Sequence, residues 1–597
     1  MAKKFIPINY SARDFNTIKK ELTEYAKRYY PDSYQDFSDA SFGSLMLDTV
    51  SYVGDVLSFY LDYQANESFL ETSLEYDNVV KLARQMGYKF DGIPTVYGTL
   101  SFYVSVPASN LGSTGPDRTY MPVIQAGSQF NATNGAYFTL TEDVNIADPR
   151  NEVVVASVDT TTGLPTKYAI KATGVVVSGQ LLTKQLTIGD FTRFLKLELD
   201  DPNVSEIISI VDTQGNEYYQ VDFLSQDVVY KDVIYANEND QNVKSLLKPF
   251  SASRRFVVEK TRTSTFLMFG YGSESETTNN VVVDPAQYIL QVHGKNYSSE
   301  TAFDPTNLIK TDKFGISPAN TILTVVYRKN NSSPSVSAGS INTVSSLRYF
   351  FQNQETLIQS QIRSVITSIE VFNDQAINGN ANLPTLEELK VKIANNFATQ
   401  NRAVTKQDYT ALVYNMPSKY GSIKRCAIYQ DSNSFKRNLN LYVLSIDRSG
   451  NFVQTNSVAK ENIKTWLNSN RMLNDTIDIL DASIINLGID FLVQADPEVD
   501  KTEVLSTCLE KLRLEYIAKF DIGEPFNISR IYNLLNSVKG VTDTINVTVS
   551  RKFGGVYSSL GYDVVKHTTN DGRFINIPKD YVFEIKFPSS DITGRIR

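Results

Sequence analysis

The chain contains very little histidine. Among 597 residues only His293 and His567 occur, and each stands alone in the sequence. Imidazole is the usual general base and metal ligand near neutral pH, so this scarcity removes most hydrolase and metalloenzyme templates. The patterns HExxH, CxxC and GxSxG are absent as well. We therefore expect no catalytic residues, no metal site and no cofactor.

Cysteine, basic runs and long apolar runs are also scarce. Cys426 and Cys508 cannot build a disulfide framework, which favours synthesis in a reducing compartment. The net charge is −8 and no long basic run occurs, which argues against a nucleic-acid surface. No stretch approaches the roughly 20 apolar residues of a membrane span. The N-terminus has no apolar signal-peptide core, so we expect neither membrane insertion nor secretion by that route.

Two further features of the sequence could indicate an enzyme, but each has a structural explanation. Residues 269–273, FGYGS, lack the spacing of a phosphate-binding loop, and a tight turn between strands explains the glycines better. The 66 acidic residues leave open a carboxylate pair of the kind that hydrolyses glycosides. However, acids such as Asp14, Glu388 and Asp408 stand at expected helix caps, where a structural role accounts for them. We favour a protein that is not an enzyme.

What the chain does contain is tyrosine and phenylalanine. It has 34 tyrosines and 32 phenylalanines against one tryptophan. Both residue types favour strands and protein interfaces. The composition therefore hints at assembly with other chains.

The clearest helical signal lies between Phe37 and Tyr88. Apolar residues recur there at the i, i+3, i+4, i+7 spacing of one face of a long helix. We call this set the predicted stripe; it comprises Met46, Val50, Val53, Leu57, Tyr60 and Leu61. Two interpretations remain open: a hairpin buried inside its own domain, or a helical bundle shared with other chains.

Helices flank this long helix on both sides. A first helix is expected from Ser11 to Tyr30, capped by Ser11 or Asp14. After the long helix, Thr72 and Glu75 form the pattern of a capping box for another helix, which Gly87 ends. The region is therefore predicted to be a helical hairpin preceded by one more helix.

The rest of the chain predicts an α+β multidomain protein. An N-terminal helical segment precedes a long, mostly antiparallel β middle and a C-terminal α+β block. Leu505, Leu509, Leu512 and Tyr516 line one helix of that block. The expected parts are a helical region at 1–92, a β-rich middle at 93–328 of one or two units, a linker with a helix at 329–383, the α+β block at 384–550 and a β-like tail at 551–597.

Three sequence blocks resemble the baseplate J-like family, the structural subunits of contractile phage tails. The first block combines GSL at 43–45, NESFL at 66–70 and LARQMGY at 82–88; the second combines RAVT at 402–405, DY at 408–409 and IKRCA at 423–427; the third combines GEP at 523–525, IY at 531–532 and GV at 540–541. Where the family has proline-glycine-valine, this chain has a longer loop at 417–422. Length and an insertion-rich middle are most similar to the wedge subunits of T-even-type phages.

The resemblance implies a non-enzymatic scaffold in the virion tail baseplate, made and assembled in the host cytoplasm. Such subunits occur as paired copies in each wedge and join a large partner through an N-terminal helical bundle. Their C-terminal domains close a ring around the tail hub, which would make Leu505, Leu509, Leu512 and Tyr516 a candidate association surface. They also contact the small wedge protein that starts the sheath, and they transmit the baseplate's conformational change. A tail-associated glycan hydrolase and a receptor-binding tail protein remain the alternatives.

Overall fold

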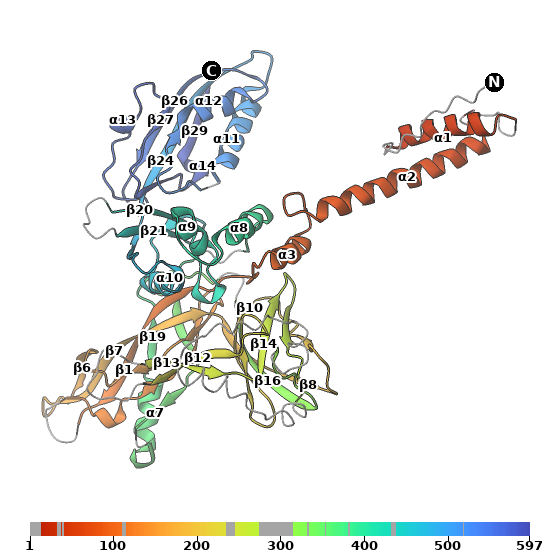
Figure 1. The fold of residues 1–597 in the computed structure, drawn as a ribbon. Coiled ribbons are helices and arrows are strands. Elements are labelled where there is room, and N and C mark those ends of the chain that lie inside the picture. Colours follow the sequence, from red (N-terminus) through yellow and green to blue (C-terminus); the bar gives the residue numbers. More distant parts are fainter. Residues whose placement is uncertain are drawn as a thin grey trace. The chain divides into compact units, whose positions relative to one another are not determined.

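The structure is a computed structural model. It describes residues 14–32, 38, 41–109, 115–234, 245–273, 314–330, 334–352, 354–379, 383–431, 438–517 and 519–597, with no side-chain description for 231–247. Helices come first, antiparallel strands dominate the middle, and the C-terminal region mixes both (Figure 1). The predicted fold class is confirmed.

The chain divides into two compact units. One comprises Met1–Phe90 with Pro384–Phe397, and the other comprises Asp91–Leu383 with Ala398–Arg597. The first unit is helical, and its elements are α1 (Phe15–Tyr29), α2 (Phe42–Glu67), α3 (Tyr76–Gln85) and most of α8 (Leu386–Thr399).

Local capping signals place these helices. The Asp14 carboxylate accepts a hydrogen bond from the Thr17 N–H at 3.1 Å and caps α1, as predicted, whereas Ser11 lies outside the described residues. Gly87 has φ of +80°, and the Tyr88 N–H donates to the Ala83 carbonyl at 2.9 Å. These two features form a Schellman motif, so the prediction that Gly87 ends the helix is confirmed.

The second unit begins with two seven-stranded sheets. The first has the order β17-β3-β4-β7-β1-β19, with β6 also paired to β7, and its core is capped by α7 (Gln359–Thr367). Its strands are β1 (Tyr97–Pro107), β3 (Gln129–Ala132), β4 (Tyr137–Leu140), β6 (Glu152–Val158), β7 (Pro165–Ser178), β17 (Ile341–Ser346) and β19 (Glu370–Phe372). A small sheet of β2 (Val123–Ile124), β5 (Val144–Asn145) and β18 (Tyr349–Phe350) accompanies it.

The second sheet has the order β8-β16-β10-β11-β14-β15-β9 and encloses a core of its own. Its strands are β8 (Gln180–Ile188), β9 (Lys196–Glu198), β10 (Val204–Val211), β11 (Glu217–Gln220), β14 (Arg255–Lys260), β15 (Thr265–Phe269) and β16 (Thr321–Lys329). β12 (Val228–Ile234) and β13 (Ser245–Ser251) form a separate hairpin. Among the described residues, the strand pairings in the two large sheets are antiparallel except that of β11 with β14, which is parallel.

Gly270 and Gly272, which follow β15, lie where two backbone segments come close together. A methyl group on Gly270 would lie 2.0 Å from the Gly315 carbonyl oxygen, which no side chain tolerates. The Gly272 N–H donates to that same carbonyl at 2.9 Å. Backbone pairing with residues 314–317, and not the predicted strand-to-strand turn, therefore explains FGYGS.

The segment 329–383, expected as a linker with a helix, contains strands as well. β17 pairs with β3, and β19 pairs with the middle of β1 through Phe102 and Val371. Four of the six residues of β17 are exposed. The segment therefore shows little of the apolar pattern from which a strand is predicted. Its pairing partners lie about two hundred residues away, beyond the reach of any local pattern.

The C-terminal block consists of two further sheets with helices. The first pairs β20 (Arg425–Gln430), β21 (Leu439–Ile446), β22 (Phe452–Val453) and β23 (Ile477–Asp481), and α9 (Lys406–Tyr414) and α10 (Ser457–Asn470) pack on it. The second is centred on β24 (Ser483–Ala495), which pairs with β26 (Val541–Lys552); α11 (Lys501–Ile517) and α12 (Ile528–Asn536) share its core. Asp408 and Glu388, which were expected at helix caps, both take part in capping boxes, with Thr405 and Thr385 respectively.

The residues after Arg551 complete this last sheet. β28 (Tyr581–Glu584) and β29 (Ile592–Ile596) both pair parallel with β24. In the sequence, α13 (Val564–His567) and β27 (Phe574–Ile575), which pairs with β25 (Phe526–Asn527), lie between β26 and β28. α14 (Pro588–Asp591) connects β28 to β29. The β-like tail is thus an integral part of the C-terminal core.

Candidate functional site

The contact between α1 and α2 is made through small side chains. Among the residues of α2, all of which are described from Phe42 to Glu67, the buried ones are Ser44 and Ser51. A methyl group on Gly54 would lie 3.2 Å from Ile18 Cδ1, so the helices approach closely at that point. Lys19 Nζ and Asp48 Oδ1 form an ion pair at 2.7 Å beside this contact. The α1-facing side of α2 is therefore narrow and poor in large apolar groups.

The large apolar residues of α2 lie on the opposite side and are exposed. Tyr60 stands nine residues after Ser51, about two and a half turns, which places it on the other face of the helix. All six residues of the predicted stripe are between 48% and 72% exposed. A helix that is also apolar on the faces that do not contact its own chain is usually buried on those faces. The stripe is thus a surface without a partner inside the described part of this chain.

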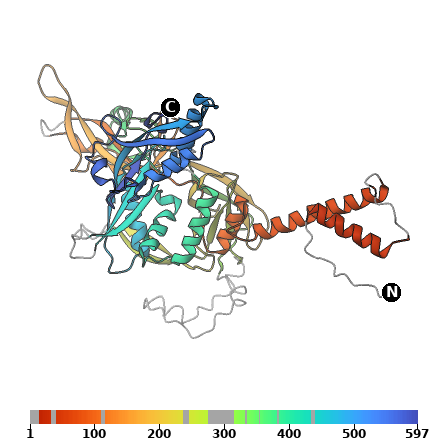
Figure 2. The same ribbon diagram turned by 90° about the horizontal axis from the view of Figure 1, so that it is seen from above.

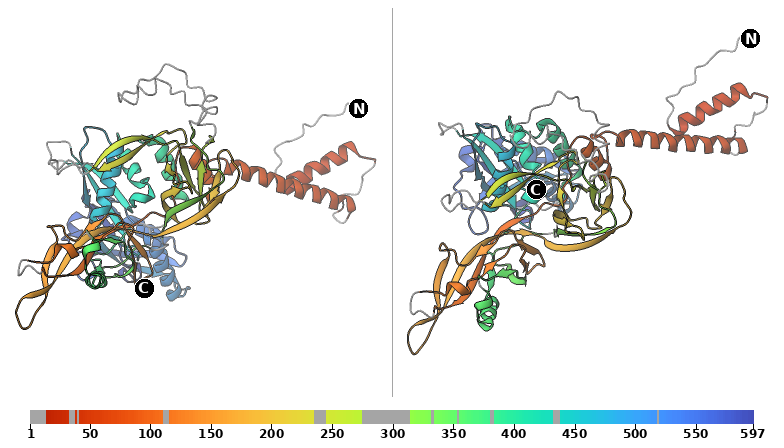
Figure 3. Two further views of the ribbon diagram at one scale, coloured as in Figure 1. Left: turned by 90° about the horizontal axis from the view of Figure 1, so that it is seen from below. Right: turned by 60° about the horizontal axis from the view of Figure 1, so that its bottom comes forward.

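Helix length adds to this exposure. α2 has 26 residues and α1 has 15, and none of the residues Phe15–Tyr29 is buried. In three directions of view, α1 lies beside the part of α2 farther from α3, and the part nearer α3 extends beyond it (Figure 1, Figure 2 and Figure 3). The part of α2 nearer α3 therefore projects without cover from α1.

A repeat in α2 is a signal that the apolar stripe alone did not reveal. The three consecutive heptads are FGSLMLD at 42–48, TVSYVGD at 49–55 and VLSFYLD at 56–62. Each has serine at its third position and aspartate at its seventh. A strict seven-residue repeat matches helices that supercoil around one another, since 3.5 residues per turn keeps one seam facing one partner.

Glu67 joins the end of α2 to the start of α3. Its carboxylate accepts hydrogen bonds from the Asn78 amide at 3.0 Å, from the Leu74 N–H at 2.7 Å and from the Ser73 hydroxyl at 2.7 Å. These donors, with the Asn78 amide foremost, lower the pKa of Glu67 from 4.5 to about 2. The carboxylate thereby accepts from the two backbone N–H groups just before α3, those of Leu74 and Glu75, and from the Asn78 side chain in the first turn.

This arrangement corrects the predicted capping box. Glu75 stands at the N-cap position of α3 but makes no side-chain capping bond, and Tyr63 donates to its carboxylate instead. The Thr72 hydroxyl donates to the Asn66 carbonyl at 2.7 Å. Thr72 and Glu75 have the spacing of a capping box. The acceptor for the N–H groups of Leu74 and Glu75 is instead the Glu67 carboxylate of the preceding helix.

Replacing Glu67 by glutamine is expected to loosen the start of α3. Hydrogen exchange at the Leu74 and Glu75 amides should become several-fold faster at neutral pH, because a neutral acceptor forms weaker hydrogen bonds. Since the folded-state pKa is depressed, the carboxylate stabilises the fold fully above about pH 4.5 and loses this effect as the pH falls through about 2. The difference between the two proteins should shrink over that range. Mass spectrometry of the peptide 68–78 measures it, and Glu71→Gln, an exposed change in the same turn, is the control.

The candidate C-terminal residues lie in a domain core. Leu512 is fully buried and Tyr516 is 7% exposed, while Leu505 and Leu509 are partly buried against the same core. The ring of Tyr516 stacks on Phe526 with centroids 5.7 Å apart. The structure therefore gives these four residues a role within the chain.

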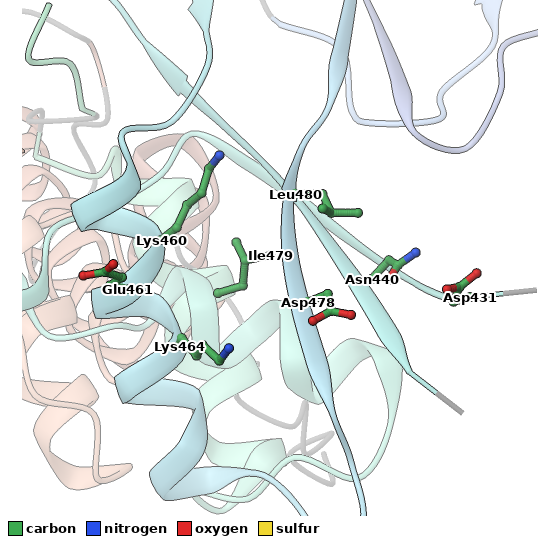
Figure 4. Close-up of a pocket in the computed structure, with 8 residues that line it drawn as sticks. All are labelled: Asp431, Asn440, Lys460, Glu461, Lys464, Asp478, Ile479 and Leu480. Atoms are coloured by element: carbon green, nitrogen blue, oxygen red, sulfur yellow. The ribbon is translucent and has the colours of Figure 1, made fainter. Parts of the chain in front are cut away.

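The residues that line the pocket beside α10 do not form a binding or catalytic site. The pocket measures about 460 Å³ and is lined by Asp431, Asn440, Lys460, Glu461, Lys464, Asp478, Ile479 and Leu480. Leu480 and Asn440 point away from α10, whereas Ile479 points toward it (Figure 4). Lys460 is paired with Asp481 at 2.6 Å. The lining charges face different directions and do not converge on one point.

His567 adds no site either. His567 Nδ1 lies 2.8 Å from the Asp563 carbonyl, and its ring stacks on Tyr562 at 4.6 Å, which is a structural arrangement. His293 lies outside the described residues. Within the described ranges, no group of three or more potential metal ligands occurs.

A family model matches the N-terminal region of this chain. Residues 14–85 match the family model described as "Bacteriophage baseplate protein, N-terminal domain". This range begins at the cap of α1 and ends with α3, so it contains the exposed face of α2. The match supports assignment of this chain as a structural subunit of a baseplate and hence of a phage tail. No curated protein matches the chain.

Two solved structures align with most of this chain. One is the cryo-EM structure of the anti-feeding prophage baseplate, 9% identical, with a TM-score of 0.26, covering 98% of this chain and 100% of that one. The other is the TssK-TssF-TssG baseplate subcomplex of a type VI secretion system, 7% identical, with a TM-score of 0.25, covering 74% and 96%. TM-scores this low do not define a shared fold. Among the described helices, none has the length and apolar character of a membrane span.

Proposed function

We propose that this chain is a structural subunit of the baseplate wedge of a contractile phage tail, related to the baseplate J-like family. The observation that carries the proposal is the exposed apolar face of α2 inside the region that matches a baseplate domain. Large contiguous apolar surfaces on a soluble chain mark interaction sites. A heptad repeat fits helices as the partners on that surface. The chain works as a scaffold and has no turnover.

The proposed partners follow from the same resemblance. Paired copies of this chain and a large wedge protein contribute helices to a bundle around α2. The C-terminal block takes part in a ring around the tail hub and contacts the small wedge protein that starts the sheath. Rigid sheets joined by interfaces with two stable arrangements would transmit the baseplate's conformational change.

Replacing Tyr60 by aspartate is expected to block this assembly. Tyr60 is 60% exposed in the free chain, so a charge there leaves the fold unchanged but puts an unpaired carboxylate into a buried helical seam. Losing an aromatic anchor of this kind weakens association by at least about 2 kcal/mol, roughly 30-fold in Kd. Leu57→Asp should act in the same way. Light scattering on the tagged chain, co-expressed with the other tail proteins of its phage, measures the mass of the complex.

Leu473→Asp is the matched control. Leu473 is fully exposed but lies in the other unit, in the connection between α10 and β23. This variant should assemble like the unmodified chain. Complexes of full mass from Tyr60→Asp and Leu57→Asp would show that α2 is not the assembly surface.

A further inference from the structure

A lysine, an asparagine and a glutamate meet where β24 and β28 run side by side in the last sheet. Asn486 and Glu584 are register neighbours on these parallel strands, so both side chains project from the same face of the sheet. Lys519 Nζ lies 2.9 Å from Glu584 Oε1, and the Asn486 amide donates to Glu584 Oε2 at 3.0 Å. One carboxyl group therefore holds an amine and a carboxamide next to each other.

This group of three side chains is nearly closed to water. Glu584 is 1% and Asn486 2% exposed, and the side chain of Lys519 is 15% exposed. Lys519 Nζ also lies 5.5 Å from the centre of the Phe452 ring, and Val582 of the same apolar core stands two residues before Glu584 on β28. A site that excludes water favours a reaction between side chains over hydrolysis.

The Asn486 amide is oriented by a hydrogen bond to each of its polar atoms. The Ser558 N–H donates to Oδ1 at 2.8 Å, while Nδ2 donates to Glu584. These partners fix which atom is oxygen, because a backbone N–H needs an acceptor and a carboxylate needs a donor. A donor at Oδ1 stands where negative charge develops when a nucleophile adds to the amide carbon. The amide is therefore presented as an electrophile.

We infer that Lys519 and Asn486 react with each other and form an amide bond between their side chains. Glu584 is the catalytic residue, because its carboxyl group contacts both reacting nitrogen atoms. The inference does not rest on the proposed function, since all three residues belong to one chain. The reaction happens once in each molecule, so the chain remains a scaffold without turnover.

The reaction balances in protons and electrons. The Lys519 ammonium passes one proton to the Glu584 carboxylate across their hydrogen bond. The electron pair freed on Nζ forms a bond to Cγ of Asn486, and the carbonyl electrons move to Oδ1. Glu584 gives its proton to Nδ2, the carbonyl re-forms, and the Cγ–Nδ2 bond breaks with its electron pair on the departing ammonia. The surplus proton on Nζ passes through Glu584 to the ammonia, so the products are one amide and one ammonium ion.

The bond ties the central strand of the last sheet to the segment that follows α11. It closes a covalent loop from Asn486 to Lys519, and α11 lies within this loop. Such a loop restricts the unfolded chain and keeps α11 close to β24 when the domain opens. The junction between the last two sheets is thereby held by a bond as well as by packing.

Mass spectrometry of the full chain, expressed alone, unfolded and digested with trypsin, tests the inference. An unreacted chain gives the separate peptide 472–501, which contains Asn486, and is cleaved after Lys519. The bond blocks cleavage at Lys519 and joins 472–501 to 514–530. This joined peptide is lighter by one ammonia than the sum of its two parts, and it should be the main form in which Lys519 is recovered.

Three variants separate the bond from the ion pair. Glu584→Gln removes the group that carries the protons and should slow formation of the joined peptide at least roughly a hundredfold. Lys519→Arg keeps a positive charge beside Glu584 but removes the nucleophile, so the joined peptide should be absent. Lys552→Arg is the matched control, because Lys552 is the register neighbour of Asn486 on β26, and it should leave the bond intact.

Separate peptides alone from the unmodified chain would overturn the inference and leave the three side chains with a structural role only. This first measurement needs no variant, so it decides the question even where a variant fails to fold. Loss of the joined peptide in Lys552→Arg would show that the wrong lysine was assigned. An undiminished yield from Glu584→Gln would remove the catalytic role of Glu584.

Discussion

Replacing Lys519 by methionine is expected to destabilise the C-terminal block by about 3–5 kcal/mol, the usual cost of removing one partner of a buried ion pair. Lys519 Nζ lies 2.9 Å from Glu584 Oε1, and Glu584 is 1% exposed. The carboxylate also accepts hydrogen bonds from the Phe452 N–H at 2.7 Å and the Asn486 amide at 3.0 Å. Methionine fills the space of the lysine stem but leaves a buried charge with neutral donors alone.

The position of this pair explains why the effect should spread. Glu584 lies on β28 of the last sheet, whereas Phe452 lies on β22 of the preceding sheet. A small apolar core with Leu444, Ile522 and Val582 spans the same junction. The Glu584 carboxylate, which accepts from Phe452 and is paired with Lys519, therefore joins two sheets that the proposed ring would load as one body.

Hydrogen exchange in increasing denaturant measures the loss, because peptides from β24 and β28 report on this block within a multidomain chain. Lys501→Met, a change at an exposed position of α11, should stay within about 0.5 kcal/mol. A second substitution, Glu584→Gln, removes the buried charge and should recover part of the loss. Equal stability of Lys519→Met and the unmodified chain would mean that the pair contributes nothing to the junction.

Local features of the fold could be predicted from the sequence with good accuracy. The caps at Asp14 and Asp408 and the end of α3 at Gly87 all depend on windows of a few residues. A hydrogen bond between a side chain and the backbone three residues away can be predicted from the sequence, because both groups belong to the same short segment. The long helix α2 could be predicted because its apolar residues recur with the period of a helix.

Features that depend on distant residues could not be predicted. Asn486 and Glu584 meet across 98 residues, and the parallel pairing of β28 and β29 with β24 has no local signature. Glu67 reaches the Leu74 N–H seven residues on, outside the spacing of a capping box. The α1-facing side of α2 consists of serine and glycine, which carry no hydrophobic signal, so the heptad was the one pattern able to reveal it.

Replacing Leu512 by alanine is expected to destabilise the C-terminal domain by about 2–5 kcal/mol, the range for a large aliphatic side chain removed from a packed core. Leu512 is fully buried among the core residues of α11, β24 and α12. The cavity left behind cannot close, because β24 is held on both edges by β26 and by β28 with β29. Hydrogen exchange of β24 peptides in denaturant measures the effect.

Leu514→Ala on the same helix separates core packing from association. Leu514 is 63% exposed, so its loss should change stability by less than about 0.5 kcal/mol. If α11 takes part in ring contacts, Leu514 and the equally exposed Ile517 are the apolar side chains on its outer face that can reach a partner. Leu514→Ala would then lower the mass of assembled complexes without loosening the domain. The opposite result would be a Leu512→Ala variant that keeps full stability but fails to associate. That result would place Leu512 in the interface and would support the association surface expected from the sequence.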